Sequence, residues 1–308
     1  MNTNVSKKDF SSIGIRMLIS TAIIFVLQIG AQKLALSLFP QWQENLTILL
    51  AVTMVPLYVL GFPIAFTLMR NKDVPAIEKH PMKPGQLVIA FLISYGLMIT
   101  GNIIGLLLTA GIGLIKGSPV QNTLLDIVTG GPIWVTAIFT VLCAPVFEEI
   151  LFRKLICNRV IKYGEGCAIL VSGLIFGLFH MNFNQFFYAF FLGCFFAFLY
   201  VKTGSLKYTI LLHMVINFFG SVLGVLILGL GQTNPYMLII SGLYSLCVLG
   251  MGIAGIVLFF VNRRKMTLKP GEIVIEKGQR FRTVILNAGM LLFCLVLLGV
   301  MLAQAFVF

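Results

Sequence analysis

Long runs of apolar residues, separated by short polar segments that hold most of the charge, dominate the pattern along this chain. A helix needs about 20 apolar residues to cross the hydrocarbon core of a bilayer, within a range of about 17 to 25. About nine runs approach or exceed this length, which predicts an all-α fold: a polytopic transmembrane helical bundle of about nine spans. The predicted spans are residues 17–39, 46–69, 87–108, 132–160, 166–181, 183–201, 206–230, 237–261 and 284–306.

Two segments between these runs also carry predictions. Residues 122–128 form a short amphipathic piece before the fourth span. Residues 263–282 form a polar loop of about twenty residues, which is too short to be a domain. Within this loop, residues 272–276 (Glu-Ile-Val-Ile-Glu) follow a Pro-Gly turn and are rich in β-branched side chains, which predicts a short strand.

Composition places the chain among membrane proteins. It has 308 residues, of which 59% are hydrophobic and 10% charged, and its mean hydropathy is +1.01. Soluble domains contain about 25% charged residues. The six cysteines lie in or beside apolar runs without paired spacing, so we expect buried small side chains rather than disulfides. The first apolar run is longer than the core of a signal peptide, and we expect it to be a retained signal anchor.

The net charge of +12 is explained by its distribution along the chain. If the N-terminus is cytoplasmic, 20 of the 22 lysines and arginines fall in cytoplasmic segments, and only Lys33 and Lys116 fall elsewhere. The positive-inside rule therefore predicts a cytoplasmic N-terminus, and nine spans place the C-terminus outside. The same charge attracts anionic lipid headgroups. We expect the lipid bilayer, and no nucleic acid, to be the partner of these basic residues.

The fourth predicted span contains three charged residues in an otherwise apolar run: Glu148, Glu149 and Arg153. A single charge at the centre of a bilayer costs about 2.5–3.5 kcal/mol, so these groups must face a protein interior or a wet cavity. Glu149 and Arg153 are four residues apart, which predicts an ion pair on one helical face. Glu148 lies about 100° around the helix and has no evident partner there.

Two histidines and one asparagine complete the set of candidate catalytic residues within the predicted spans. His180 and His213 lie in the fifth and seventh spans, and Asn217 shares a helical face with His213. His80, the third histidine, lies in a loop and is expected to be solvated. At 1.5 Å per residue, Glu148, His180 and His213 lie about 10–22 Å from the cytoplasmic ends of their spans. They can therefore meet at a similar depth in one intramembrane site.

Two chemical interpretations fit these residues. A glutamate beside imidazoles and an amide can activate water and stabilise an oxyanion. Alternatively, Glu148, His180 and His213 form a two-histidine, one-carboxylate set that can bind Zn²⁺. The soluble metalloprotease signature H-E-x-x-H is absent from the sequence.

These residues form three motifs that resemble the CPBP family of intramembrane proteases, the CAAX-protease and bacteriocin-processing (Abi-type) group. The motifs are Glu148-Glu149-x-x-x-Arg153, Phe176-x-x-x-His180 and His213-x-x-x-Asn217. The resemblance covers residues 131–230 and implies a four-helix catalytic core of about four spans there. Residues 1–130 then supply about three flanking spans, and residues 231–308 supply about two with the loop 263–282.

The resemblance also implies roles for the motif residues. Glu148 activates water with His180, His213 and Asn217 stabilise the oxyanion, and Glu149 with Arg153 gives structural support. We prefer a metal-free mechanism without a cofactor, because the Glu–His and His–Asn pairs then give every polar residue a role. Zinc held by Glu148, His180 and His213 is the alternative.

The expected function is that of an intramembrane endopeptidase in a bacterial cytoplasmic membrane, which hydrolyses a peptide bond of a membrane-associated peptide or protein. Two alternatives stay open. One is a non-enzymatic membrane immunity or interaction protein that retains the fold. The other is a proton-coupled transporter, since buried glutamate and histidine also occur in proton relays. The first, third, eighth and ninth spans contain few polar residues, which argues against transport.

Overall fold

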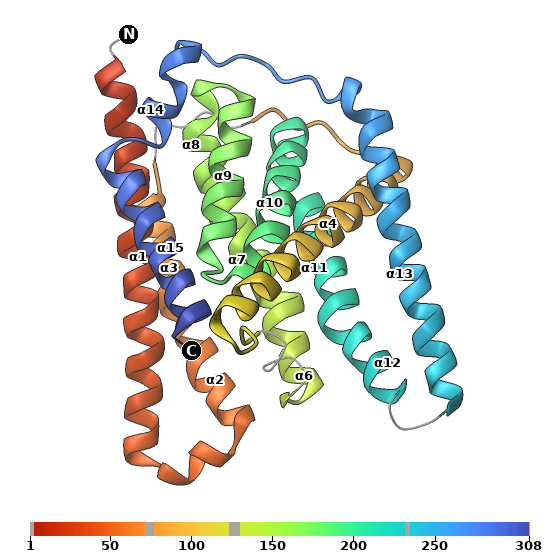
Figure 1. Ribbon diagram of the computed structural model, residues 1–308. Helices are drawn as coiled ribbons and strands as arrows, with labels where there is room; N and C mark the ends of the chain where they lie inside the picture. The colour runs from red at the N-terminus through yellow and green to blue at the C-terminus, as the bar shows by residue number, and fades with distance from the viewer. Residues whose placement is uncertain (1–2, 72–76, 123–129, 232–234, 308) are drawn as a thin grey trace.

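The computed structural model describes residues 3–71, 77–122, 130–231 and 235–307, which form a bundle of helices (Figure 1). In these ranges there is no strand, and eight helical segments are long and apolar enough to cross a membrane. The predicted all-helical membrane fold is confirmed. The fifth predicted span, residues 166–181, corresponds to α9 (Glu165–Phe179), an apolar helix of 15 residues. Its length of about 22 Å falls short of the bilayer core.

The N-terminal part of the chain forms three helices long enough to cross a membrane: α1, the continuous helix α2–η2–α3, and α4. Helix α1 begins well before residue 17, where the first span was predicted, because its first turns bury Phe10 and Ile13 against the bundle. The elements are α1 (Thr3–Leu38), η1 (Pro40–Glu44), α2 (Leu46–Pro56), η2 (Leu57–Gly61), α3 (Phe62–Met69) and α4 (Pro84–Lys116).

The central part of the chain contains the residues singled out in the sequence. Its first helix is continuous from residue 133 to the end of η5, but it alternates between α-helical and π-helical turns. Of the predicted amphipathic piece, residues 123–128 lie outside the described residues. The elements are α6 (Ile133–Thr136), η3 (Ala137–Cys143), α7 (Ala144–Glu149), η4 (Ile150–Cys157), α8 (Asn158–Val160), η5 (Ile161–Tyr163), α9, α10 (Phe183–Thr203), α11 (Leu206–Asn217), η6 (Phe218–Leu223) and α12 (Gly224–Gly231).

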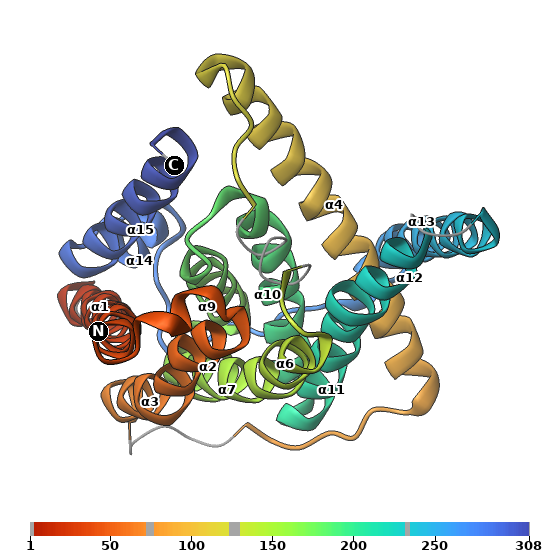
Figure 2. The same cartoon turned by 90° about the horizontal axis from the view of Figure 1, so that it is seen from below.

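The C-terminal part lies at two opposite edges of the bundle. The elements are α13 (Pro235–Asn262), η7 (Arg263–Lys265), η8 (Lys277–Gln279), α14 (Arg280–Val284) and α15 (Ala288–Phe306). Figure 1 shows α15 beside α1, with α13 at the other edge. Helix α4 runs obliquely across the bundle and packs against both α10 and α13 (Figure 2). In Figure 1 the central helices α7, α9, α10 and α11 therefore lie between α1 and α15 on one side and α13 on the other.

Small residues allow the two central helices α9 and α10 to pack closely. A Cβ atom added to Gly173 would lie 2.8 Å from the backbone nitrogen of Cys194, which leaves no room for a side chain. Close approach of this kind is typical of helix packing inside membranes. The turn between the two helices contains Met181, whose φ of 55° is left-handed although it is not a glycine. This turn directly follows His180.

The loop 266–276 is extended and packs against the start of α9, but it forms no strand. The prediction of a strand at 272–276 was wrong, because Ile273 N–H donates to the Lys162 carbonyl at 2.9 Å instead of pairing with another strand. The Glu165 carboxylate accepts a hydrogen bond from Lys269 N–H at 2.8 Å and forms an ion pair with Lys202. These contacts fasten the loop to both α9 and the end of α10.

Replacing Gly271 with alanine is expected to loosen this loop. A Cβ atom at Gly271 would lie 2.2 Å from Gly164 N and 2.3 Å from the Lys162 carbonyl oxygen. Such an overlap typically costs about 1–3 kcal/mol. We expect a lower thermal unfolding midpoint and faster proteolysis of the loop in detergent. The matched control is Gly278→Ala in η8, directly after the loop, where a Cβ atom meets nothing within 4 Å. Equal unfolding midpoints and equal proteolysis rates for the two variants would refute the packing argument.

Candidate active site

A buried ion pair anchors the site. Arg153 Nε lies 3.0 Å from Glu149 Oε2, and both side chains are 0% exposed, so the ion pair predicted from the spacing is confirmed. Arg153 Nη1 donates to Ser172 Oγ on α9 at 3.0 Å, and Ser172 in turn donates to the Phe152 carbonyl at 2.9 Å. A buried pair requires such further hydrogen bonds to offset the loss of water. The ion pair therefore also joins η4 to α9.

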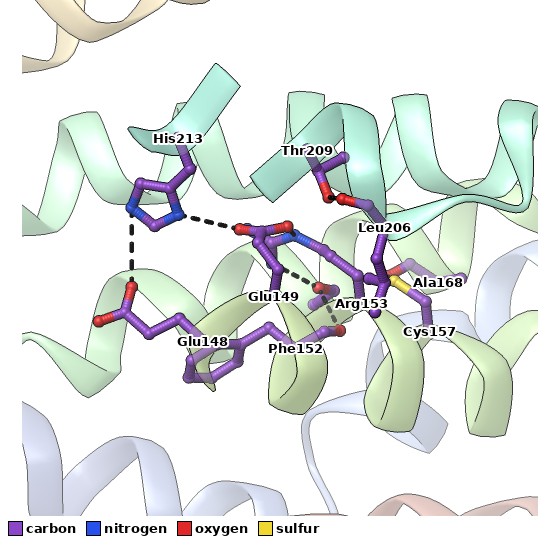
Figure 3. A network of polar contacts seen from close by, with 10 residues as sticks. Glu148, Glu149, Phe152, Arg153, Cys157, Ala168, Leu206, Thr209 and His213 are labelled. Atoms are coloured by element: carbon purple, nitrogen blue, oxygen red, sulfur yellow. Dashed lines mark hydrogen bonds and ion pairs between the residues drawn. The ribbon is translucent and has the colours of Figure 1, made fainter. Parts of the chain in front are cut away.

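His213 of α11 lies between the two glutamates, as Figure 3 shows. Its Nδ1 lies 3.1 Å from Glu149 Oε1, and its Nε2 lies 3.8 Å from Glu148 Oε2. Glu149 is already paired with Arg153, so its carboxylate accepts and His213 Nδ1–H donates. This bond fixes the tautomer of the neutral ring and turns Nε2 towards Glu148. Glu148 thus has a partner from a different helix, which the sequence analysis did not predict.

The side chain of Asn217 binds the backbone carbonyl of Thr140, which lacks a helical hydrogen-bond donor because residue 145 is a proline. In η3 the N–H of Ala144 donates to the Phe139 carbonyl, five residues earlier. In that register the next N–H would reach the Thr140 carbonyl, but residue 145 is a proline and has none. Asn217 Nδ2 donates to the Thr140 oxygen instead, at 2.7 Å. One amide hydrogen of Asn217 therefore positions its side chain, and one remains.

Replacing Asn217 with alanine is expected to leave the Thr140 carbonyl unsatisfied and to destabilise the protein by about 1–3 kcal/mol. Adding Pro145→Ala to that variant supplies a backbone N–H that can donate to the Thr140 carbonyl, so the double variant should recover part of the lost stability. The measurement is the unfolding midpoint in detergent for the two single variants and the double variant. Strictly additive losses would contradict this account of the carbonyl.

His180 follows the last turn of α9 and is fixed by a backbone hydrogen bond. Its Nδ1 lies 2.9 Å from the Phe176 carbonyl, which can only accept, so Nδ1 carries the hydrogen. The Phe176 ring meets the rings of His180 and His213 edge-on, at centroid distances of 5.0 and 5.9 Å. Arg153 lies over the same ring, 4.7 Å from its centroid. Phe176 thus packs between the two histidines and the buried ion pair.

A cavity of about 350 Å³ brings these groups together. Glu148, His180, His213 and Asn217 all line it, so the four residues proposed from the sequence as catalytic share one space. Their roles stay predictions. The cavity also has polar lining residues that the sequence analysis did not name: Asn102, Thr140, Asn184, Gln185, Tyr188 and Ser221.

One signal in the sequence could have found some of these residues. Asn182, Asn184 and Gln185 are three amides within four positions between two apolar runs. They open α10, directly after His180, and Asn182 Oδ1 caps the helix by accepting from Gln185 N–H at 2.8 Å. Amide side chains in a membrane helix need partners in the protein interior or a wet cavity.

A second, larger cavity lies away from these residues. Its volume is about 730 Å³, and it lies between α9, α14 and the loop 266–276. Its lining is almost entirely apolar and includes none of the motif glutamates or histidines. Size alone would favour this cavity as the active site, but only the smaller cavity contains glutamate and histidine side chains that could activate water.

The residues considered for zinc do not form a ligand set in this structure. Within the described ranges, no three side chains of histidine, cysteine, aspartate or glutamate are grouped closely enough to hold one metal ion. His213 lies between Glu148 and Glu149, whereas His180 is fixed to the Phe176 carbonyl.

Comparison with known proteins shows which family this part of the chain resembles. The family model described as "Type II CAAX prenyl endopeptidase Rce1-like" matches residues 130–219, which include every motif residue described above. Residues 130–219, the Rce1-like segment, are therefore similar to this family of CAAX proteases. The resemblance noted in the sequence is thereby confirmed for the Rce1-like segment.

Two curated relatives extend the comparison beyond the Rce1-like segment. The chain is 30% identical over 141 residues to the "Putative membrane peptidase YdiL" of Bacillus subtilis (strain 168), covering 43% of this chain and 55% of that protein. It is 27% identical over 212 residues to the "Membrane-embedded CAAX protease MroQ" of Staphylococcus aureus (strain USA300), covering 65% and 85%. The chain thus spans about half the length of the first relative. No solved structure matches it.

Proposed function

We propose that this chain is an intramembrane endopeptidase that uses a glutamate and histidines to hydrolyse a peptide bond of a membrane-associated peptide or protein. The observation that carries the proposal is the convergence of Glu148, His180, His213 and Asn217 on one cavity. These side chains come from α7, α11 and the end of α9. Buried polar groups of this kind are costly in a membrane. The names of the two bacterial relatives support proteolysis as the activity.

In the proposed mechanism, a water molecule binds between Glu148 and His180, whose Nε2 in the neutral ring accepts one of its hydrogens. The Glu148 carboxylate takes the other proton while the water oxygen bonds to the carbonyl carbon of the substrate. The carbonyl π electrons move to oxygen, which becomes an oxyanion. Glu148 then gives its proton to the amide nitrogen as the C–N bond breaks, which yields a carboxylic acid and an amine.

The remaining polar groups stabilise and position this reaction. Asn217 has one free amide hydrogen to donate to the oxyanion, since its other bond goes to Thr140. Donation from His213 Nε2 requires the doubly protonated ring, whose added charge the Glu149 carboxylate at Nδ1 compensates. Glu149 and Arg153 are buried and act through His213 rather than on the substrate.

We further propose the arrangement of the chain in the membrane. Residues 131–230 form the catalytic core, and residues 1–130 and 231–308 supply the flanking spans. The lysine and arginine distribution supports a cytoplasmic N-terminus, an external C-terminus and contact with anionic lipid. The bacterial relatives support the bacterial cytoplasmic membrane as the location.

Comparative proteomics of membranes tests the proposed function. Cells that produce the wild-type chain are compared with cells that produce Glu148→Gln at the same level. An uncut polypeptide that accumulates only with the variant would name the substrate, and its mass would show whether it is lipidated. Unchanged polypeptides together with full biological function of the variant would favour a non-enzymatic immunity or interaction protein. Ion-coupled uptake by proteoliposomes would favour a transporter.

A chelator test addresses the zinc alternative. We expect purified protein to retain cleavage after dialysis against EDTA, since Glu148, His180 and His213 are not grouped as ligands. Loss of cleavage that is restored by zinc alone would overturn the metal-free mechanism.

A further inference from the structure

The cavity contains fewer hydrogen-bond donors for an oxyanion than its number of polar residues suggests. Both histidines donate their Nδ1–H to protein oxygens, the Phe176 carbonyl and the Glu149 carboxylate. When the rings are neutral, each therefore has only a lone pair at Nε2. Asn217 has one amide hydrogen in use. A donor that needs no change of protonation would stabilise the developing charge directly.

Tyr188 on α10 is such a donor, and a chain of hydrogen bonds fixes its direction. The chain begins at Asn182, whose Oδ1 accepts from Gln185 N–H at 2.8 Å and whose Nδ2 donates to the His180 carbonyl at 2.9 Å. A backbone N–H can only donate and a backbone carbonyl can only accept, so these two bonds determine which atom of the Asn182 amide is oxygen and which is nitrogen. Asn182 Nδ2 also donates to Gln185 Oε1 at 2.6 Å, which leaves Gln185 with Nε2 as its other polar atom.

Gln185 Nε2 then donates to the Tyr188 hydroxyl oxygen at 2.8 Å. An amide nitrogen cannot accept, so the hydrogen of the hydroxyl is not used in this bond. Across the described residues, no protein acceptor lies within hydrogen-bond distance of that hydrogen. Tyr188 lines the same cavity as Glu148 and His180, and its ring lies edge-on to His180 with centroids 6.4 Å apart. The free hydrogen is therefore available to a group inside the cavity.

The backbone at Tyr188 is held in place by α4. A Cβ atom at Gly101 would lie 2.3 Å from Tyr188 Cα, so α4 contacts the α10 backbone directly at this residue. A fixed backbone and an oriented hydroxyl together meet the requirement that a catalytic donor be held before the substrate arrives.

We propose that Tyr188 is a further catalytic residue, whose hydroxyl donates a hydrogen bond to the scissile carbonyl oxygen as that oxygen gains charge. No proton is transferred from the phenol, and Gln185 acts as a positioning residue by holding the hydroxyl oxygen. The inference rests on the proposed protease function.

The test compares Tyr188→Phe with Tyr200→Phe. Tyr200 is a buried tyrosine on the same helix, and its hydroxyl donates to Asn158 Oδ1 at 3.0 Å, away from the cavity. The substrate is the polypeptide that accumulates in membranes of cells producing Glu148→Gln. Each purified variant is added to these membranes after solubilisation, and quantitative mass spectrometry follows the loss of the polypeptide. A dilution series of the membranes varies the substrate concentration and gives kcat and KM. We expect Tyr188→Phe to lower kcat by about 10²-fold with little change in KM, as for other oxyanion donors. Tyr200→Phe should keep the wild-type kcat.

Gln185→Met is a second variant, which keeps the Tyr188 hydroxyl but removes the hydrogen bond from Gln185 Nε2 that orients it. Because Gln185 acts through Tyr188, the double variant Gln185→Met/Tyr188→Phe should be no slower than Tyr188→Phe alone. Wild-type kcat in Tyr188→Phe, or additive losses in the double variant, would overturn the role of Tyr188 while the protease proposal stands. If the wild-type protein itself removes no polypeptide, the proposed function fails, and this inference fails with it.

Discussion

Replacing Glu148 with glutamine is expected to lower the rate of peptide-bond cleavage by about 10²- to 10⁴-fold, the usual contribution of a general base. Glutamine has nearly the same shape but cannot take a proton from water. The fold should be unaffected, because Glu148 is not part of the buried ion pair and its side chain retains 14% exposure. The measurement is the initial rate for purified protein acting on solubilised membranes from Glu148→Gln cells.

The matched control for this prediction is Glu165→Gln. Glu165 is also a nearly buried glutamate, but it pairs with Lys202 and the loop at the opposite end of α9 from His180, and it does not line the cavity. We expect this variant to keep the wild-type rate per folded molecule. If Glu148→Gln retained more than about a tenth of the rate, Glu148 would not be the base.

Replacing Arg153 with methionine is expected to destabilise the protein by about 3–5 kcal/mol, the usual cost of removing one partner from a buried pair. Glu149 would remain at 0% exposure without the guanidinium that compensates its charge. Ser172 would lose its contact with the guanidinium as well. The measurement is the midpoint of unfolding in mixed micelles with increasing SDS, together with the yield of folded protein.

The double variant Glu149→Gln/Arg153→Met separates charge burial from packing. Removing both charges should restore most of the lost stability, since a neutral pair in this position carries no uncompensated charge. Cleavage should stay low in the double variant, because His213 would lose the carboxylate that fixes its tautomer. An unchanged unfolding midpoint in Arg153→Met would contradict the structural role of the pair.

Features that depend on one helix at a time could be predicted from the sequence. The apolar runs predicted the helices, and the spacing of Glu149 and Arg153 predicted their ion pair, since neighbours four residues apart share a helical face. The three motifs predicted the resemblance of residues 130–219 to the CAAX-protease family model. Similar depth along the spans also suggested that Glu148, His180 and His213 could meet, and all three line the cavity.

Features that depend on how helices rotate against one another could not be predicted. Nothing in the spacing shows that His213 contacts both glutamates, because they lie on another helix 64 and 65 residues earlier in the chain. The start of α10 at Phe183 agrees with the predicted span, but the amide chain from Asn182 to Tyr188 depends on side-chain orientations that the apolar pattern does not specify. The strand expected at 272–276 did not form, because the loop packs against the start of α9 instead.

The proline in the glutamate helix makes two distant positions depend on each other. The Thr140 carbonyl needs one donor, which comes either from the backbone at position 145 or from the side chain at position 217. Any change that gives position 145 an N–H removes the need for Asn217 to bind there and frees its second amide hydrogen. Among related chains, these two positions should therefore vary together, although 72 residues separate them.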